Sequence, residues 1–235
     1  MINPLILSTV FWQRRKWSGE RGKNLLTNLA GRRVIESMQT DELFYELFQV
    51  DPRSLFRLVN LSLEGEYTFE SLTIKSTEKR LDGFCKRTDG VGPNVFVEIQ
   101  GYDDPAIYWR GLREIATFYE QTRDARPFIL IFLFLDAKWD PANFPFAATQ
   151  PPHQVIRTTL AACLASLTED AGLLTVLKPL LASPQEIREH ARQWQTELQR
   201  QPLDAAQKRQ LSELLEFAIR RGCRNYQNRR YEPCC

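Results

Sequence analysis

The sequence predicts an α/β protein with a mixed β-sheet core flanked by helices and a helical C-terminal region. Residues 94–100 alternate side chains between two faces with the two-residue period of a strand. Residues 128–135 form a continuous apolar run, which is typical of a central strand buried on both faces. Within residues 171–219, apolar side chains recur at a spacing near 3.6, which indicates helices.

The first half of the expected fold is set by short periodic segments between turn signals. Asp51-Pro52 separates two short helices, and the turn-rich residues 86–93 are suited to close a hairpin between two strands. These two helices and the first three strands are expected at residues 41–49, 53–61, 67–75, 79–86 and 94–100.

A helix is expected next, with Asp104 as its cap and Pro105 in its first turn. Its apolar stripe, which includes Tyr108, should pack on the sheet, while Arg110 and Glu114 are spaced to pair outside that stripe. Prolines after the apolar strand indicate a long loop. The remaining elements are a strand at 154–160 and helices at 171–181, 184–199 and 205–219.

Composition is that of an ordinary globular protein, with 43% hydrophobic and 26% charged residues. The longest apolar run is too short to cross a bilayer. Basic residues follow the apolar stretch at residues 4–12, whereas a secretory signal would have them first. The five cysteines show no metal-site or disulfide spacing. We therefore predict a cytoplasmic protein with no membrane partner.

Charge is distributed unevenly, although the net charge is only +2. Residues 1–37 carry seven basic and two acidic residues, and residues 220–235 carry five arginines and one glutamate. The stretch 38–219 between them is therefore acidic. Because nucleic-acid binding ordinarily depends on clustered Lys and Arg, this stretch either contains a local basic groove or has another main partner.

Both basic ends differ from the sequence between them. Met38 is the only methionine after Met1, so residues 1–37 are expected to be a non-native or disordered extension upstream of the true start. Residues 220–235 are expected to form a basic, irregular tail. Alternatively, the two ends are basic arms that bind nucleic acid.

Polar groups are expected to converge at one edge of the sheet. Glu98 and Gln100 project from the same face of one strand, and Asp82 comes from the neighbouring strand of the hairpin. Two carboxylates on adjacent strands suit a hydrated Mg²⁺ bound together with substrate phosphate oxygens. The pattern fits metal-assisted phosphodiester cleavage. In the alternative interpretation, Glu98 and Gln100 line the solvated face of an edge strand and Asp82-Gly83 is only a turn.

A resemblance to a known family is carried by four motifs. They are TDELFY at 40–45, RLDG at 80–83, VEIQ at 97–100 and YWR at 108–110. In this order they resemble the Rpn family of recombination-promoting nucleases and transposase-like proteins, and its cyanobacterial branch described as a domain of unknown function. The resemblance extends from about residue 38 to about residue 219.

The Rpn family belongs to the PD-(D/E)XK nuclease superfamily, so the resemblance implies a restriction-endonuclease-like fold. Its core is a helix, three strands, a helix and a further strand, expected here within residues 38–160. Residues 161–219 then form a helical C-terminal subdomain, which acts as a lid or provides the interface of a homodimer.

The resemblance also implies a metal site. Asp82 and Glu98 would bind Mg²⁺ or Mn²⁺, with the backbone carbonyl of Ile99 as a further ligand. Gln100 stands where the superfamily usually has lysine; its amide can orient the attacking water but supplies no positive charge.

Three more residues have implied roles near this site. Asp41 would complete the metal shell or, alternatively, only cap the first helix. Arg80 and Arg110 would contact substrate phosphate or pair with the site carboxylates.

Together with the carboxylate pattern, the resemblance implies a Mg²⁺-dependent DNA endonuclease of the Rpn type, with DNA as its partner and a role in recombination. The alternative is a catalytically weak or inactive nuclease-fold protein that serves as a DNA-binding or protein-interaction module. The acidic stretch and Gln100 favour that alternative. A small-molecule hydrolase has little support, because no Ser/His/Asp or Cys/His arrangement is visible.

Overall fold

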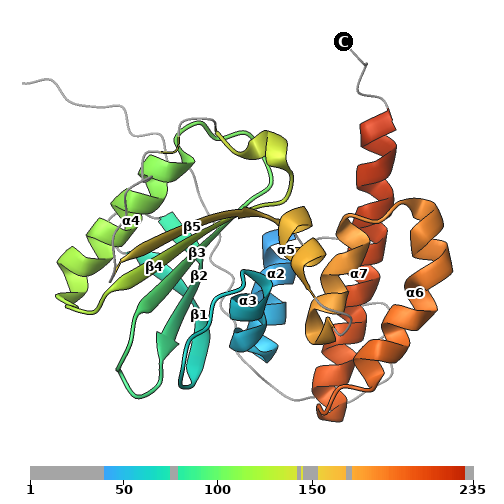
Figure 1. Ribbon diagram of the computed structural model, residues 1–235, viewed down its shortest axis with the longest axis horizontal. Coiled ribbons are helices and arrows are strands. Elements are labelled where there is room, and N and C mark those ends of the chain that lie inside the picture. Colours follow the sequence, from blue (N-terminus) through green and yellow to red (C-terminus); the bar gives the residue numbers. More distant parts are fainter. Residues whose placement is uncertain (1–39, 75–78, 142–143, 145–152, 168–170, 231–235) are drawn as a thin grey trace, which may run out of the picture.

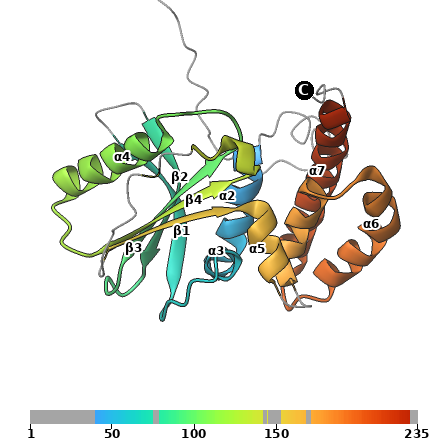
Figure 2. The same cartoon turned by 45° about the horizontal axis from the view of Figure 1, so that its top comes forward.

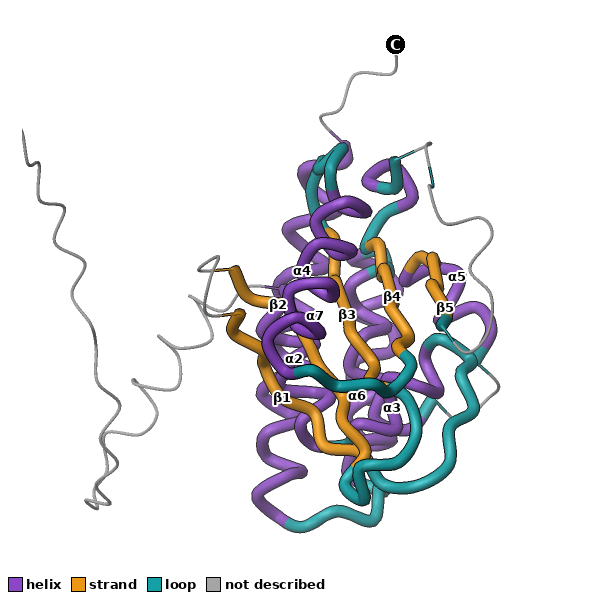
Figure 3. Tube along the Cα trace, turned by 90° about the vertical axis from the view of Figure 1, so that its left-hand side faces the viewer, coloured by secondary structure: helices purple, strands orange, loops and turns teal. Residues whose placement is uncertain are grey.

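The computed structural model describes residues 40–74, 79–141, 144, 153–167 and 171–230, so the expected extension at 1–37 lies outside the described residues. A five-stranded sheet with the order β1-β2-β3-β4-β5 forms the centre of the fold. Strands β1 to β3 pair antiparallel, whereas β3, β4 and β5 pair parallel. Figure 3 shows the strands side by side in this order. They are β1 (Tyr67–Ile74), β2 (Lys79–Arg87), β3 (Asn94–Gln100), β4 (Phe128–Phe134) and β5 (Gln154–Thr159).

Helices cover both faces of this sheet (Figure 1). Helix α4 (Ile107–Thr122) lies on one face, and all the longer remaining helices lie on the other side (Figure 2). These are α2 (Thr40–Val50), α3 (Pro52–Leu58), α5 (Leu160–Ser166), η2 (Gly172–Leu180), α6 (Pro184–Gln199) and α7 (Ala205–Arg230), while the short η1 (Ala137–Trp139) follows β4. The predicted α/β class, with a mixed sheet flanked by helices and a helical C-terminal region, is confirmed.

The order of elements from α2 to β4 is helix, three strands, helix and strand, with α3 added after the first helix. This is the order that the family resemblance implies. No helix in the described part of the chain is both long and apolar enough to span a membrane.

Each face of the sheet has its own hydrophobic cluster. On the α4 face the cluster is largely aromatic, and Tyr108 packs edge-on against Phe132, as expected for a core residue. Helix α4 approaches β4 closely at Gly111, where an added Cβ would lie 2.8 Å from the Phe132 ring. On the opposite face, one cluster runs continuously from α2 through the sheet to α7. The C-terminal helices therefore share a core with the sheet.

The structure differs from the sequence-based prediction in two elements near residue 170. Residues 172–180 form a 3₁₀ helix, not an α-helix. Pro179 disfavours an α-helical turn over residues 175–179, because a proline ring clashes with the carbonyl four residues earlier in an α-helix. Helix α5 was not predicted. It begins after Thr159, whose hydroxyl accepts a hydrogen bond from Ala162 N at 3.1 Å.

The expectation of an irregular chain from residue 220 onward is wrong for residues 220–230. Helix α7 continues through Arg230. At Gly222 it lies directly against η2, where an added Cβ would be 2.0 Å from the Pro179 carbonyl oxygen. Only a residue without a side chain permits this approach, so Gly222 is a packing residue of the helix.

Candidate functional site

A cavity of about 500 Å³ lies at the carboxyl ends of β3 and β4. These two strands are parallel, and Leu135 N donates to Gln100 O at 2.9 Å where they end. The carboxyl edge of parallel strands is a common ligand-binding position in α/β proteins. Residues from two strands, three helices and the loops after β3 and β4 line the cavity: Thr40, Asp41, Asp82, Glu98, Ile99, Gln100, Gly101, Tyr102, Arg110, Leu135 and Arg221.

The structure brings Asp82 and Glu98 together. The β2–β3 ladder ends with Gly83 opposite Val97, and the next pair in this register is Asp82 opposite Glu98. Opposite residues of an antiparallel pair project from the same face, and here the two side chains are hydrogen-bonded to each other. Asp82 also accepts a hydrogen bond from Ile99 N at 2.8 Å.

The alternative interpretation, that Glu98 and Gln100 line the solvated face of an edge strand, is wrong. Strand β3 is the central strand of the sheet, and every one of its residues is buried. Glu98 is only 3% exposed and Gln100 only 1%. Burying an ionisable group at this depth is costly, so its presence calls for a specific role.

The two carboxyl groups resist ionisation. Burial raises the pKa of Glu98 well above its ordinary value, and the charge of Asp82 raises it further. Burial also raises the pKa of Asp82 to about 6, although the hydrogen bond from Ile99 N opposes this shift. A pair of this kind cannot easily carry two negative charges without a nearby cation.

A third carboxyl group lies behind Glu98. Glu114 was expected to pair with Arg110 outside the buried stripe of its helix. Instead it is 3% exposed, and its side chain is hydrogen-bonded to Glu98. Its Oε2 is buried and accepts no hydrogen bond from any residue that the structure describes. The helical spacing from Ile107 and Gly111 places Glu114 on the inner face of α4, and this signal could have predicted its burial.

Arg110 pairs with acidic residues of the site. Its Nη2 lies 3.7 Å from Glu98 Oε2 and 3.4 Å from Asp104 Oδ2. The side chain is also hydrogen-bonded to the Tyr102 hydroxyl. Of the two roles implied for Arg110, the structure therefore contains the ion pair with the site carboxylates.

Both ends of the Gln100 amide have partners. Its Oε1 accepts a hydrogen bond from Arg110 Nη2 at 3.4 Å, and its Nε2 donates to the carbonyl oxygen of Tyr102. Gln100 thus holds Arg110 and the loop after β3 in place. A water-orienting role would use the second hydrogen of the amide.

Of the two remaining predicted residues, Asp41 lies at the cavity, whereas the side chain of Arg80 is not described. Asp41 lies in the first turn of α2, lines the cavity, and raises the pKa of Asp82 through its charge. The backbone of Arg80 pairs with Thr73, but its side chain lies outside the described part of the chain. Arg221, from the far end of α7, also lines the cavity. Arg221 was not expected at the site, because residues 220–235 were expected to form an irregular tail.

The carboxyl groups of the cavity provide a small donor set for a divalent cation. No group of three or more His, Cys, Asp or Glu side chains within the described residues is arranged to hold a metal ion. Asp82 and Glu98 provide two carboxyl groups on a cavity with room for water. Mg²⁺ is commonly bound by one or two carboxylates and several waters, so the residues fit this ion.

Fold and cavity together define an α/β protein with a carboxylate pair at the carboxyl edge of a mixed sheet. The chain belongs to the family described as "Protein of unknown function (DUF2887)", whose family model matches residues 40–230. That match includes all of α7, so residues 220–230 are part of the family domain. No curated protein and no solved structure matches the chain.

Proposed function

We propose that this protein is a Mg²⁺-dependent DNA endonuclease of the Rpn type, within the PD-(D/E)XK superfamily. The observation that carries the proposal is the convergence of Asp82 and Glu98 on the wall of a polar cavity. The raised pKa values of both groups support it, because perturbed carboxyl groups gather at functional sites.

In this proposal Asp82, Glu98 and the carbonyl of Ile99 hold the ion. Bound Mg²⁺ would polarise a phosphoryl oxygen and lower the pKa of a coordinated water. Asp82 is held in place by Ile99 N, and Glu98 by its contacts with Arg110 and Glu114. Gln100 keeps Arg110 beside Glu98, so that one positive charge remains at the reacting edge of the cavity.

Metal binding should depend on pH. Burial raises the pKa of both Asp82 and Glu98, so their protonated forms persist to higher pH than those of exposed carboxyl groups. Because a divalent cation would bind the ionised forms, its binding would be coupled to loss of protons from this pair. We therefore expect Mg²⁺ affinity and nicking activity to rise between pH 6 and 8.

A second candidate is a catalytically weak or inactive nuclease-fold protein that serves as a DNA-binding or interaction module. The pairing of Arg110 with acidic side chains favours it, because this arginine has less charge available for substrate. Cytoplasmic location and homodimer formation stay predictions under either function.

The test is nicking of supercoiled plasmid by the full-length protein in Mg²⁺ or Mn²⁺. Asp82→Ala and Glu98→Ala are compared with Asp103→Ala, which removes an exposed carboxylate outside the cavity lining. Calorimetric titration with Mn²⁺ gives a second readout on the same proteins. We expect nicking and Mn²⁺ binding by the wild type and by Asp103→Ala, and loss of both in the other two variants.

The two candidate functions give different results in this assay. A folded wild type that binds plasmid without nicking it would support the inactive module. A folded wild type that neither nicks nor binds DNA would contradict the endonuclease and the DNA-binding module, and would leave only a protein-interaction module. Nicking that survives in Asp82→Ala and Glu98→Ala would place the active site elsewhere or indicate a contaminating nuclease.

A further inference from the structure

Helix α7 places an arginine at the carboxylate cavity, far in sequence from the other lining residues. Arg221 lines this cavity, and its side chain is exposed. It forms no ion pair with any residue that the structure describes. In contrast, Arg110, the other arginine in the lining, contacts Glu98 and Asp104. Arg221 is therefore the arginine in this lining whose charge is available for a ligand.

The position of Arg221 is fixed by contacts of the helix that carries it. The neighbouring Gly222 is buried against Pro179 of η2. Closer to the start of α7, Gln210 Nε2 donates to Glu46 Oε2 of α2 at 2.6 Å. Because α2 also carries Asp41, these contacts tie the helix bearing Arg221 to another wall of the cavity.

The cavity needs such a cation if it is to accept a phosphodiester. Asp41, Asp82 and Glu98 all line it, and these carboxyl groups repel an anionic substrate when they are ionised. Gln100 supplies no positive charge. A guanidinium presents several N–H donors in a planar fork that matches phosphate oxygens, and an exposed arginine loses little solvation when it binds them.

We propose that Arg221 binds a phosphate of the nucleic-acid backbone in this cavity and supplies the positive charge that Gln100 does not. The proposal rests on the proposed function, and it identifies the last helix of the domain as part of the substrate-binding surface. It also gives an acidic domain a specific means of binding DNA.

The test compares Arg221→Gln with Arg220→Gln in the full-length protein. Arg220 is the adjacent arginine, it is absent from the cavity lining, and it pairs with Glu216 on the same helix at 3.7 Å. The two variants therefore lose the same charge from neighbouring positions. Binding of a fluorescent DNA duplex is measured in Ca²⁺ over a series of salt concentrations, and plasmid nicking is measured in Mg²⁺.

We expect Arg221→Gln to weaken duplex binding about tenfold, the usual scale for a hydrogen bond to a charged group. The slope of log affinity against log salt should fall by about 1, because one phosphate contact is lost. Nicking should fall by at least the same factor. Arg220→Gln should stay within about twofold of the wild type in both assays, as expected for an exposed charge away from the site.

Three outcomes separate the inference from the proposed function. Nicking by the wild type with no difference between Arg221→Gln and Arg220→Gln would overturn the inference alone. A wild type that neither binds nor nicks DNA would overturn both. If Arg221→Gln fails to fold, Arg221→Lys is used in its place. Lysine keeps the positive charge but lacks the planar guanidinium, so nicking should fall while the slope of log affinity against log salt stays unchanged. Unchanged nicking by the lysine variant would contradict the inference.

Discussion

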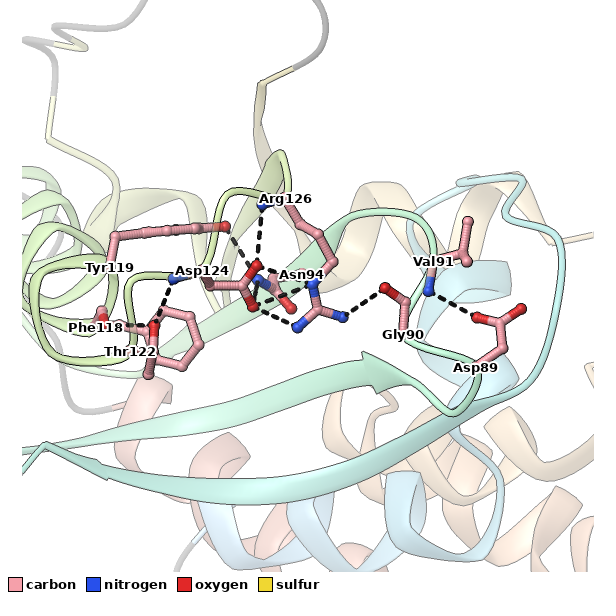
Figure 4. Close-up of polar contacts among 9 residues, drawn as sticks. All are labelled: Asp89, Gly90, Val91, Asn94, Phe118, Tyr119, Thr122, Asp124 and Arg126. Atoms are coloured by element: carbon pink, nitrogen blue, oxygen red, sulfur yellow. Dashed lines mark hydrogen bonds and ion pairs between the residues drawn. The ribbon is translucent and has the colours of Figure 1, made fainter.

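Strand β3 has a polar region at each end, and the two regions differ in how many hydrogen-bond donors surround their carboxyl groups. At its beginning, fully buried Asn94 meets Asp124 and Arg126 (Figure 4). At its other end lie Asp82 and Glu98. Each region borders a cavity, of about 320 Å³ at Asp124 and Arg126 and about 500 Å³ at the carboxylate pair.

In the first region, the charge of Asp124 is compensated by hydrogen-bond donors. Arg126 Nε donates to Asp124 Oδ1 at 2.9 Å and to Oδ2 at 3.1 Å, and Arg126 N donates to Oδ1 at 3.0 Å. Asn94 Nδ2 adds a further hydrogen bond at 3.1 Å. Together these donors, led by the Arg126 side chain, hold the pKa of Asp124 well below its ordinary value.

The carboxylate pair has too few donors by comparison. Arg110 reaches Glu98 only at 3.7 Å, and the other neighbours of Glu98 include Asp82 and Glu114. The comparison shows that this fold surrounds a partly buried carboxylate with donors at one end of β3 and not at the other. Excess negative charge at the other end of the same strand therefore favours a binding role over a structural one.

The largest expected effect separates the two regions by function. Glu98→Ala should lower plasmid nicking by at least about 1000-fold, the scale of losing a metal-binding group in catalysis. Its stability without metal should not fall, because repulsion with Asp82 is removed. Asp124→Ala should unfold more easily but nick normally while folded. Nicking rates and urea denaturation are measured for both variants. If both lost the same stability, Glu98 and Asp124 would not differ in function in the way proposed.

A smaller effect is expected when the compensation around Asp124 is broken. Arg126→Ala leaves a partly buried carboxylate with only Asn94 as a side-chain partner. The free energy of unfolding should fall by about 2–3 kcal/mol, because the hydrogen bonds lost are to a charged group. Urea denaturation at pH 7 measures this. The control is Arg113→Ala on the exposed side of α4, which should change stability by less than about 0.5 kcal/mol.

The elements that sequence analysis located well are those with a strong period or a clear signal. The bounds of β3 and α6 were predicted correctly, β3 from its alternation and α6 from Ser183-Pro184, which forms a capping box with Glu186. In contrast, α5 spans only residues 160–166 and was missed. A segment this short shows too little periodicity to be recognised.

From residue patterns alone, the site was predictable only where one local pattern contained it; Asp41 and Arg110, which also line the cavity, were expected there through the family resemblance. Asp82, Glu98 and Gln100 lie on adjacent strands of one hairpin, so the sheet geometry predicted that they meet. Arg221 comes from a helix far along the chain, and no local pattern links it to β3. Glu114 was expected on the surface because it lies four residues after Arg110, a spacing typical of exposed ion pairs. That spacing does not show how α4 packs on the sheet, and this packing buries Glu114.

The two regions should also respond oppositely to pH. Folding raises the pKa of Asp82 from 3.8 to about 6, so between these values the folded state binds more protons than the unfolded state. The free energy of unfolding therefore falls as pH rises through this range, and Glu98 extends the fall to higher pH. Folding lowers the pKa of Asp124. Its contribution to the free energy of unfolding is therefore complete above about pH 4 and is lost only in stronger acid.

Asp82→Asn tests this pH dependence. In EDTA, the wild type should be less stable at pH 8 than at pH 5, and the variant should remove about 1–3 kcal/mol of that difference. Asp103→Asn, at an exposed position outside the cavity lining, should behave like the wild type. The measurement is urea denaturation of all three proteins at both pH values. A wild type that is more stable at pH 8 than at pH 5 would contradict the raised pKa values of Asp82 and Glu98.

The smallest expected effects come from one hydroxyl group in each region. Tyr119 Oη accepts a hydrogen bond from Asn94 Nδ2 at 3.2 Å, so Tyr119→Phe should cost about 0.5–1 kcal/mol of stability without changing nicking. The hydroxyl of Tyr102, a residue that is 57% exposed, is hydrogen-bonded to Arg110 at the cavity. Tyr102→Phe should therefore leave stability within about 0.5 kcal/mol and lower nicking several-fold. Since both substitutions remove a single oxygen atom, the reverse result, with nicking sensitive to Tyr119 and stability sensitive to Tyr102, would mean that the functional end of β3 has been misassigned.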